Sequence, residues 1–89
     1  MKQGIRIVYL GRLAEVAGKP ESEIGSSFGE LDWPDILAVL DNHVADGLAD
    51  AVRDERVKVA LNGAVLADRE SLVARNGDEV AFLPPVSGG

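Results

Sequence analysis

The last six residues contain the group best suited to chemistry. Pro84-Pro85-Val86-Ser87-Gly88-Gly89 ends in two glycines, and we expect Gly89 to carry a free carboxylate. A carboxylate resists nucleophilic attack because resonance and negative charge both oppose it, so it must first be activated, usually by adenylation with ATP. The acyl-adenylate can then accept a sulfur or amine nucleophile. Gly88 and Gly89 leave the carbonyl unobstructed, whereas alanine or any larger residue should hinder both steps.

Two prolines separate this ending from the body of the protein. Pro84 and Pro85 lack a backbone N–H and have a fixed φ, so a β-ladder must stop there. They also favour an extended, polyproline-like path, which Val86 and Ser87 continue. A plain strand terminator would explain the prolines but not the glycines. The sequence therefore predicts a domain over 1–83 and a projecting, flexible tail over 84–89 that can enter a narrow channel in another protein.

Composition excludes several other chemistries. The 89 residues include no cysteine, which rules out a disulfide, a cysteine nucleophile and a thiolate metal site. The single histidine, His43, cannot form a histidine-rich metal site and is interpreted as a solvated or core-edge residue. We expect no metal and no permanently bound cofactor.

Charge and hydropathy define the partners to expect. The net charge is −6, which repels nucleic acid and favours partners with basic surfaces. The N-terminus lacks the apolar core of a signal peptide, and no stretch approaches the roughly 20 apolar residues of a membrane helix. We therefore expect a cytoplasmic protein that binds neither nucleic acid nor membranes.

The elements that must position the tail are mostly strands. Runs of β-branched or alternating apolar residues predict strands at 5–10, 21–28, 57–61, 64–66 and 79–83. The polar residues of the second run indicate an edge strand, and an Asn-Gly pair between the third and fourth predicts a two-residue hairpin. Alternation turns Val80 and Phe82 inward and places Leu10 and Leu83 on the opposite face of the sheet.

One helix is clearly marked. Asp32 can cap its first N–H groups, and Pro34 lies where a missing N–H costs nothing. Its apolar residues form one stripe at helical spacing: Trp33, Ile36, Leu37, Leu40 and Val44. Residues 11–18 are compatible with one helical turn or a loop, and a short helix is expected near 48–52. A single stripe covers one face of a small mixed sheet, so the predicted fold is α+β, a ubiquitin-like β-grasp roll of four or five strands.

The chain resembles a known family over nearly its whole length. Residues 76–89 are similar to the C-terminal signature of the small subunit of molybdopterin synthase, the MoaD-type sulfur carriers of the MoaD/ThiS family, and the Pro-Pro-Val-Ser-Gly-Gly ending is its most specific part. Residues 57–65 and 5–15 resemble the family as well. Two features depart from it: Ala14 stands where the family often has arginine, and the helix begins with Trp33-Pro34 rather than a small aliphatic residue.

The resemblance implies a mechanism with several partners. An enzyme of the ubiquitin-activating class would adenylate Gly89 with ATP and magnesium, and a sulfur donor enzyme would supply the sulfur of a terminal thiocarboxylate. Pro84, Pro85, Val86 and Ser87 would insert into the large synthase subunit, where a cyclic pterin phosphate would receive the sulfur and become the dithiolene that binds molybdenum. The chain would not be catalytic alone, and a heterotetramer of two small and two large subunits is implied.

The resemblance also assigns Leu10, Val65 and Leu83 to the interface with the partner. Ordinary packing against residues 11–18 is the alternative for the two leucines. Other functions stay open: a sulfur carrier for thiamine, cysteine or tRNA thiolation, a protein modifier whose Gly89 forms isopeptide bonds with lysines, or a β-grasp binding module without tail chemistry. Carriers for thiamine tend to be shorter and to lack the Pro-Pro step.

Overall fold

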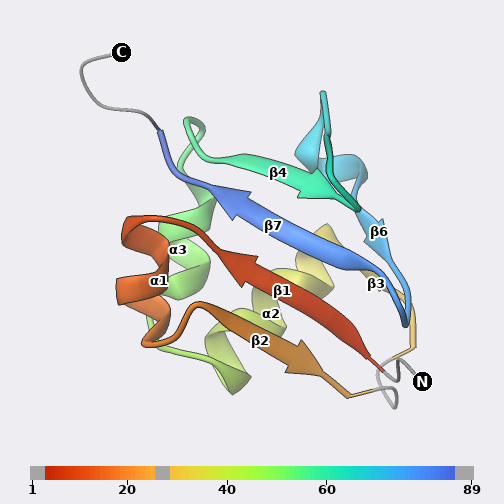
Figure 1. Ribbon diagram of the computed structural model, residues 1–89, viewed down its shortest axis with the longest axis horizontal. Helices are drawn as coiled ribbons and strands as arrows, with labels where there is room; N and C mark the ends of the chain where they lie inside the picture. Colours follow the sequence, from red (N-terminus) through yellow and green to blue (C-terminus); the bar gives the residue numbers. More distant parts are fainter. Residues whose placement is uncertain (1–3, 26–28, 86–89) are drawn as a thin grey trace.

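A computed structural model describes residues 4–25 and 29–85. Within these residues, five strands form one mixed sheet in the order β2-β1-β7-β4-β5. Their bounds are β1 (Ile5–Tyr9), β2 (Glu21–Ile24), β4 (Lys58–Leu61), β5 (Ala64–Val65) and β7 (Glu79–Leu83). β1 and β7 pair in parallel, and the remaining neighbours are antiparallel. The first and last long strands are therefore neighbours in the middle of the sheet, and the predicted edge position of β2 is confirmed (Figure 1).

The helices cover one face of this sheet. The described chain has three α-helices: α1 (Arg12–Ala17), α2 (Trp33–His43) and α3 (Leu48–Arg53), and α2 and α3 lie behind the sheet in Figure 1. Alternate strand residues point toward them and are buried, namely Ile5, Ile7, Tyr9, Val59, Val80 and Phe82. Within residues 4–25 and 29–85, no helix lies on the opposite face of the sheet. This arrangement is the predicted ubiquitin-like β-grasp roll.

The start of α2 follows the predicted capping chemistry. The Asp32 carboxylate accepts a hydrogen bond from the Asp35 amide at 3.0 Å, and the Asp35 carboxylate accepts one from the Asp32 amide at 3.3 Å. This reciprocal capping box satisfies donors that the first helical turn leaves free. The predicted stripe is buried from Trp33 to Leu40, and Val39 is buried as well, which widens it. His43 is exposed, within its predicted range.

A second, two-stranded sheet was not predicted. β3 (Leu31–Asp32) pairs antiparallel with β6 (Val73–Ala74), and a 3-10 helix, η2 (Arg69–Ser71), precedes β6. These pairs are too short to show any hydrophobic period in the sequence. This pairing holds the segment before α2 against the segment before β7. The connection that leads into α2 and the connection that leads into β7 are therefore fixed beside the core.

Arg69 joins η2 to the end of α3. Its guanidinium donates hydrogen bonds to the carbonyls of Val52 (3.1 Å), Asp54 (2.6 Å), Val57 (3.3 Å) and Arg53. The last carbonyls of a helix lack hydrogen-bond donors within the helix, and the Arg69 guanidinium supplies these donors. Its guanidinium carbon also lies 5.4 Å from the centroid of the Trp33 ring, a cation–π arrangement. One side chain thus connects three elements on the helical side of the molecule.

Among the described residues, no helix has both the length and the apolar character needed to cross a bilayer.

Candidate functional site

The site is built around the point where the chain leaves the sheet. β7 ends at Leu83, and Pro84 and Pro85 follow it. β1 ends at the same end of the sheet, where it runs into α1 (Figure 1). The predicted reacting group, Gly88-Gly89, and the tail residues Val86 and Ser87 lie outside the described residues. The structure therefore describes the root of the tail and its surroundings.

The parallel ladder between β1 and β7 stops at Pro84 for a defined reason. The Leu10 amide donates to the Phe82 carbonyl at 3.2 Å. In a continuing parallel ladder, the amide of residue 84 would be the next donor, to the Leu10 carbonyl. Pro84 has no amide proton, and the Leu10 carbonyl instead accepts from the Leu13 amide at 3.1 Å, in the first turn of α1. The ladder thus ends at the double proline, as the sequence predicts.

Gly11 lies against this break and is not among the site residues predicted from the sequence. Its backbone has φ 56° and ψ −131°, a conformation that side chains strongly disfavour. A Cβ atom built on Gly11 would lie 3.0 Å from Cγ of Pro84. A glycine directly between a strand and a helix was the signal available in the sequence. Nothing in the sequence indicates that it contacts a residue 73 positions later.

The helix-free face of the sheet presents an apolar surface beside the tail root. We call Leu10, Val65 and Leu83 the outer-face patch. Leu10 is 41% exposed and Val65 is 56% exposed, whereas Leu83 is half-buried. The strand register places a row of small and medium apolar residues across four strands of this face, in the order Val8, Ala81, Ala60 and Val65. The three predicted interface residues therefore border one continuous apolar surface.

Charged residues border that surface away from the tail. The Arg6 guanidinium lies 2.5 Å from the Glu21 carboxylate and 3.8 Å from that of Glu79. The hydrogen bond with Glu21 and its negative charge raise the pKa of Arg6 further above its usual range. Apolar residues at the centre and charged residues at the rim are the usual anatomy of a protein–protein interface. The arrangement is suited to docking of another protein.

The other side of the tail root borders a groove formed by α1 and the segment between α3 and β4. The groove has a volume of about 510 Å³, and its lining includes Leu13, Val16, Val57, Pro84 and Pro85. Asp54 and Arg56 form an ion pair at its rim, with 2.9 Å between Nη2 and Oδ2. The hydrogen bond from Arg56 lowers the pKa of Asp54 to about 2. Pro84 and Pro85 therefore lie along this groove at the start of the tail.

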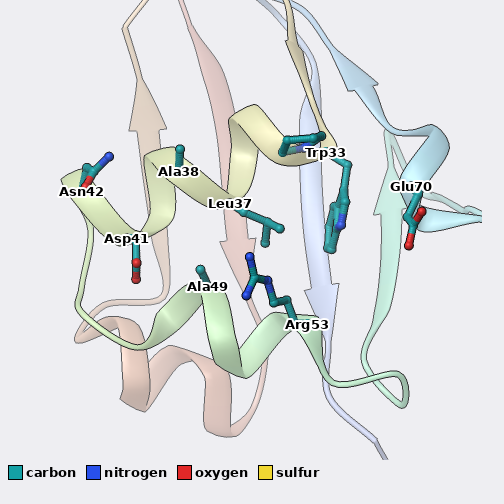
Figure 2. A pocket seen from close by; sticks show the side chains of 9 residues that line it. Trp33, Leu37, Ala38, Asp41, Asn42, Ala49, Arg53 and Glu70 are labelled. Atoms are coloured by element: carbon teal, nitrogen blue, oxygen red, sulfur yellow. The ribbon is translucent and has the colours of Figure 1, made fainter.

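A separate hollow of about 590 Å³ lies on the helical side (Figure 2). Its side chains come from α2, α3 and η2, and Arg53 points from α3 toward α2. In the described part of the chain, no buried side-chain nitrogen or oxygen lacks a hydrogen-bond partner. Likewise, residues 4–25 and 29–85 contain no cluster of three or more histidine, cysteine or acidic side chains able to hold a metal. Among the described residues, this hollow therefore presents no metal-binding cluster.

Comparison with known proteins connects this geometry to a family. The model of the ThiS family matches residues 7–89. The chain is 30% identical over 87 residues to the molybdopterin synthase sulfur carrier subunit of Escherichia coli (strain K12), and the alignment covers 96% of this chain and 99% of that protein. The two proteins are homologous over essentially their whole length.

Solved structures agree with the fold. The crystal structure of SAMP1 from Haloferax volcanii has a TM-score of 0.67 and 31% identity, and the alignment covers 97% of this chain and 99% of that one. A chain in the complex of subunits 1 and 2 of the molybdopterin-converting factor from Helicobacter pylori 26695 has a TM-score of 0.62 and 22% identity, covering 96% of this chain and 97% of that one. At that identity the second likeness shows the fold. Since the family model matches all but the first six residues, the chain belongs to the ThiS family.

Proposed function

We propose that this protein is a sulfur carrier, the small subunit of a molybdopterin synthase. The observation that carries the proposal is the exit of the chain from the sheet at Pro84-Pro85, beside an exposed apolar surface and four positions before Gly89. Homology to the Escherichia coli sulfur carrier subunit supports it. The protein would be cytoplasmic and would not be catalytic by itself.

The chemistry proposed for Gly89 proceeds in two steps. An activating enzyme of the ubiquitin-activating class uses ATP and magnesium to form the acyl-adenylate and release pyrophosphate. A sulfur donor enzyme then supplies sulfur at the oxidation level of sulfide, which attacks the carbonyl and displaces AMP to leave a thiocarboxylate. Because Gly88 and Gly89 have no side chains, neither the adenylation nor the attack of sulfur on the carbonyl is obstructed. ATP and magnesium would belong to the activating enzyme, not to this chain.

The partner that accepts the sulfur would dock on the outer-face patch. This partner, the large subunit, would hold the cyclic pterin phosphate, and residues 84–89 of this chain would insert into it. The Helicobacter pylori structure is a complex of the two subunits of a molybdopterin-converting factor, which supports a large subunit as the partner here. We extend this proposal to a heterotetramer of two small and two large subunits.

A protein modifier is the second candidate. The observation that favours it is 31% identity to SAMP1, a protein also described as small archaeal modifier protein 1. In this case the activated Gly89 carbonyl would be attacked by a lysine amine of another protein and would form an isopeptide bond. Activation is common to both candidates, so only the acceptor distinguishes them. A sulfur carrier for thiamine, cysteine or tRNA thiolation would share the thiocarboxylate and differ in the final recipient.

The deciding experiment is an intact-mass measurement after incubation with ATP, magnesium, a competent activating enzyme and a sulfur source. A mass gain equal to the exchange of one oxygen for one sulfur, mapped to Gly89, supports the carrier. The control is a chain that lacks Gly89, which should fold normally and gain no sulfur. Unchanged mass in the full chain, or sulfur transfer by the truncated chain, would refute the carrier. Adducts on lysines of other proteins would support the modifier.

A further inference from the structure

The contact between Gly11 and Pro84 joins the two strand ends at the tail root. Gly11 has φ 56° and ψ −131°, and an added Cβ would lie 3.0 Å from Cγ and 3.9 Å from Cδ of the Pro84 ring. The first of these distances is tighter than ordinary van der Waals contact between carbon atoms, which is about 3.5–4.0 Å. The ring of Pro84 therefore occupies space that is free because residue 11 has no side chain.

This contact lies where the backbone stops guiding the chain. The last β1–β7 hydrogen bond is Leu10 N–H to the Phe82 carbonyl, and Pro84 cannot donate another. Beyond that bond, the direction of the chain depends on the proline rings and on what they touch. The Pro84 ring lies next to Gly11, and Pro84 and Pro85 both line the groove beside α1.

We propose that Gly11 is a positioning residue that sets the direction in which the tail leaves the domain. The proposal rests on the proposed function, in which the tail must enter the active site of a docked partner. Gly11 acts through Pro84 and does not itself touch the reacting atoms. Its role is to let the Pro84 ring seat against the end of β1.

The geometry of the tail magnifies a small change at its root. The five residues after Pro84 reach at most about 17 Å when fully extended. A ring displaced by a few tenths of an ångström tilts the start of the tail, and the stiff double proline carries the tilt outward. A misplacement of about 1 Å can reduce the rate of a positioned reaction by about a hundredfold.

The test compares alanine at two glycines that flank the same helix. Gly11→Ala places a methyl group against Pro84. Gly18→Ala is the matched control, because Gly18 also has a positive φ of 81° but a Cβ there meets nothing within 4 Å. Both variants carry the strain of a positive φ, but it is larger for Gly11→Ala because its ψ of −131° lies outside the left-handed region that Gly18 occupies. Only Gly11→Ala also displaces the tail root, and the double-mutant cycle below separates this displacement from backbone strain. Assays are run below the unfolding transition of every variant.

The expected result separates docking from reaction. For thiocarboxylated protein reacting with the large subunit and cyclic pterin phosphate, Gly11→Ala should lower the single-turnover rate at least tenfold, while Kd for the large subunit changes less than twofold. Gly18→Ala should change both quantities less than twofold. Equal rates for the two variants, or a loss for Gly11→Ala that appears only in Kd, would overturn the proposal.

A double-mutant cycle tests the route through Pro84. In the Pro84→Ala background the ring that the methyl group strikes is gone, so Gly11→Ala should cost less than threefold in rate. The same tenfold loss in both backgrounds would show that Gly11 acts through strain alone. If Gly11→Ala does not fold, Pro84→Ala is compared with Pro85→Ala. A larger loss for Pro84→Ala is expected, because the Gly11 contact involves Pro84 alone among the prolines, and equal losses would refute the role.

A measurement without sulfur chemistry separates this inference from the proposed function. Residual dipolar couplings of the amides at 86–89, referred to those of the sheet, report the direction of the tail in the free protein. Gly11→Ala should change them and Gly18→Ala should not. A wild-type chain that takes up no sulfur would refute the proposed function, while unchanged couplings in Gly11→Ala would refute the orienting role of Gly11.

Discussion

The outer-face patch allows a quantitative prediction for the double variant Leu10→Ala/Val65→Ala. Leu10 is 41% exposed and Val65 is 56% exposed, and docking would bury these fractions. Full burial of a leucine or valine side chain contributes about 2 kcal/mol, so the two exposed fractions contribute about 0.8 and about 1.1 kcal/mol. Their loss weakens binding by about 2 kcal/mol, or about 25-fold in Kd. Alanine keeps the backbone unchanged and removes most of the apolar surface.

The assay is isothermal titration calorimetry, in which the large subunit is titrated with the wild-type protein or with a variant. Val73→Ala is the matched control, because Val73 is a 40% exposed apolar residue on β6, in the two-stranded sheet outside the patch. It should leave Kd unchanged. Thermal unfolding should be nearly the same for all three proteins, since exposed side chains contribute little to folding stability.

Two results would refute this reasoning. Equal Kd values for the wild type and the double variant would mean that the partner does not bury Leu10 and Val65. A Kd for Val73→Ala raised as much as that of the double variant would mean that the effect is not confined to the outer-face patch. In either case the partner docks elsewhere, and the groove on the other side of the tail root becomes the next surface to test.

Three further predictions concern single residues. Leu83→Asp should raise Kd for the large subunit at least tenfold with little loss of stability, and calorimetry with an unchanged Kd would remove Leu83 from the patch. Arg69→Ala should lower the free energy of unfolding by about 2–3 kcal/mol, because carbonyls at the end of α3 lose a charged donor, and urea unfolding should show this while Kd stays constant; unchanged stability would contradict the assigned role. Stability should also fall from about pH 4 to pH 2, because the pKa of Asp54 is lowered to about 2 by the hydrogen bond from Arg56. A carboxyl group whose pKa is lowered by folding stabilises the folded state at pH values above its pKa in the unfolded chain. This stabilisation is lost as the pH falls through the pKa in the folded protein. Urea unfolding against pH should therefore show a smaller decrease for Asp54→Asn, and equal slopes would contradict it.

Local rules explain the elements that the sequence predicted well. The last strand has the predicted bounds, Glu79–Leu83, and Val80 and Phe82 are buried as alternation requires. Asp32 caps α2 because a short acidic side chain reaches the free amides of the first turn. These features depend on neighbours a few positions away, and such neighbours are visible in the sequence.

Other features depended on distant residues. Residues 11–18 were compatible with one helical turn or a loop, and the structure shows the helix α1 (Arg12–Ala17), whose Leu13 and Ala17 are buried in the core. Alternation placed Leu83 on the face of the sheet opposite Val80 and Phe82, but how far its side chain is covered depends on distant neighbours, and it is half-buried. β3 and β6 are two residues long, and their pairing is held by the surrounding tertiary structure. Arg69 reads as an ordinary surface arginine until α3 and the segment that follows it place four carbonyls around its guanidinium.

The sequence by itself determined the chemistry available to this protein. An ending in two glycines after two prolines, with no cysteine in the chain, is what makes the main-chain carboxyl of Gly89 the group that we expect to be activated. Only the tertiary structure decided how that ending is held. Gly11 and Pro84 are 73 positions apart, and the parallel pairing of β1 with β7 brings them into contact. Covalent reactivity follows from residue types, whereas direction and docking depend on contacts that form only when the chain folds.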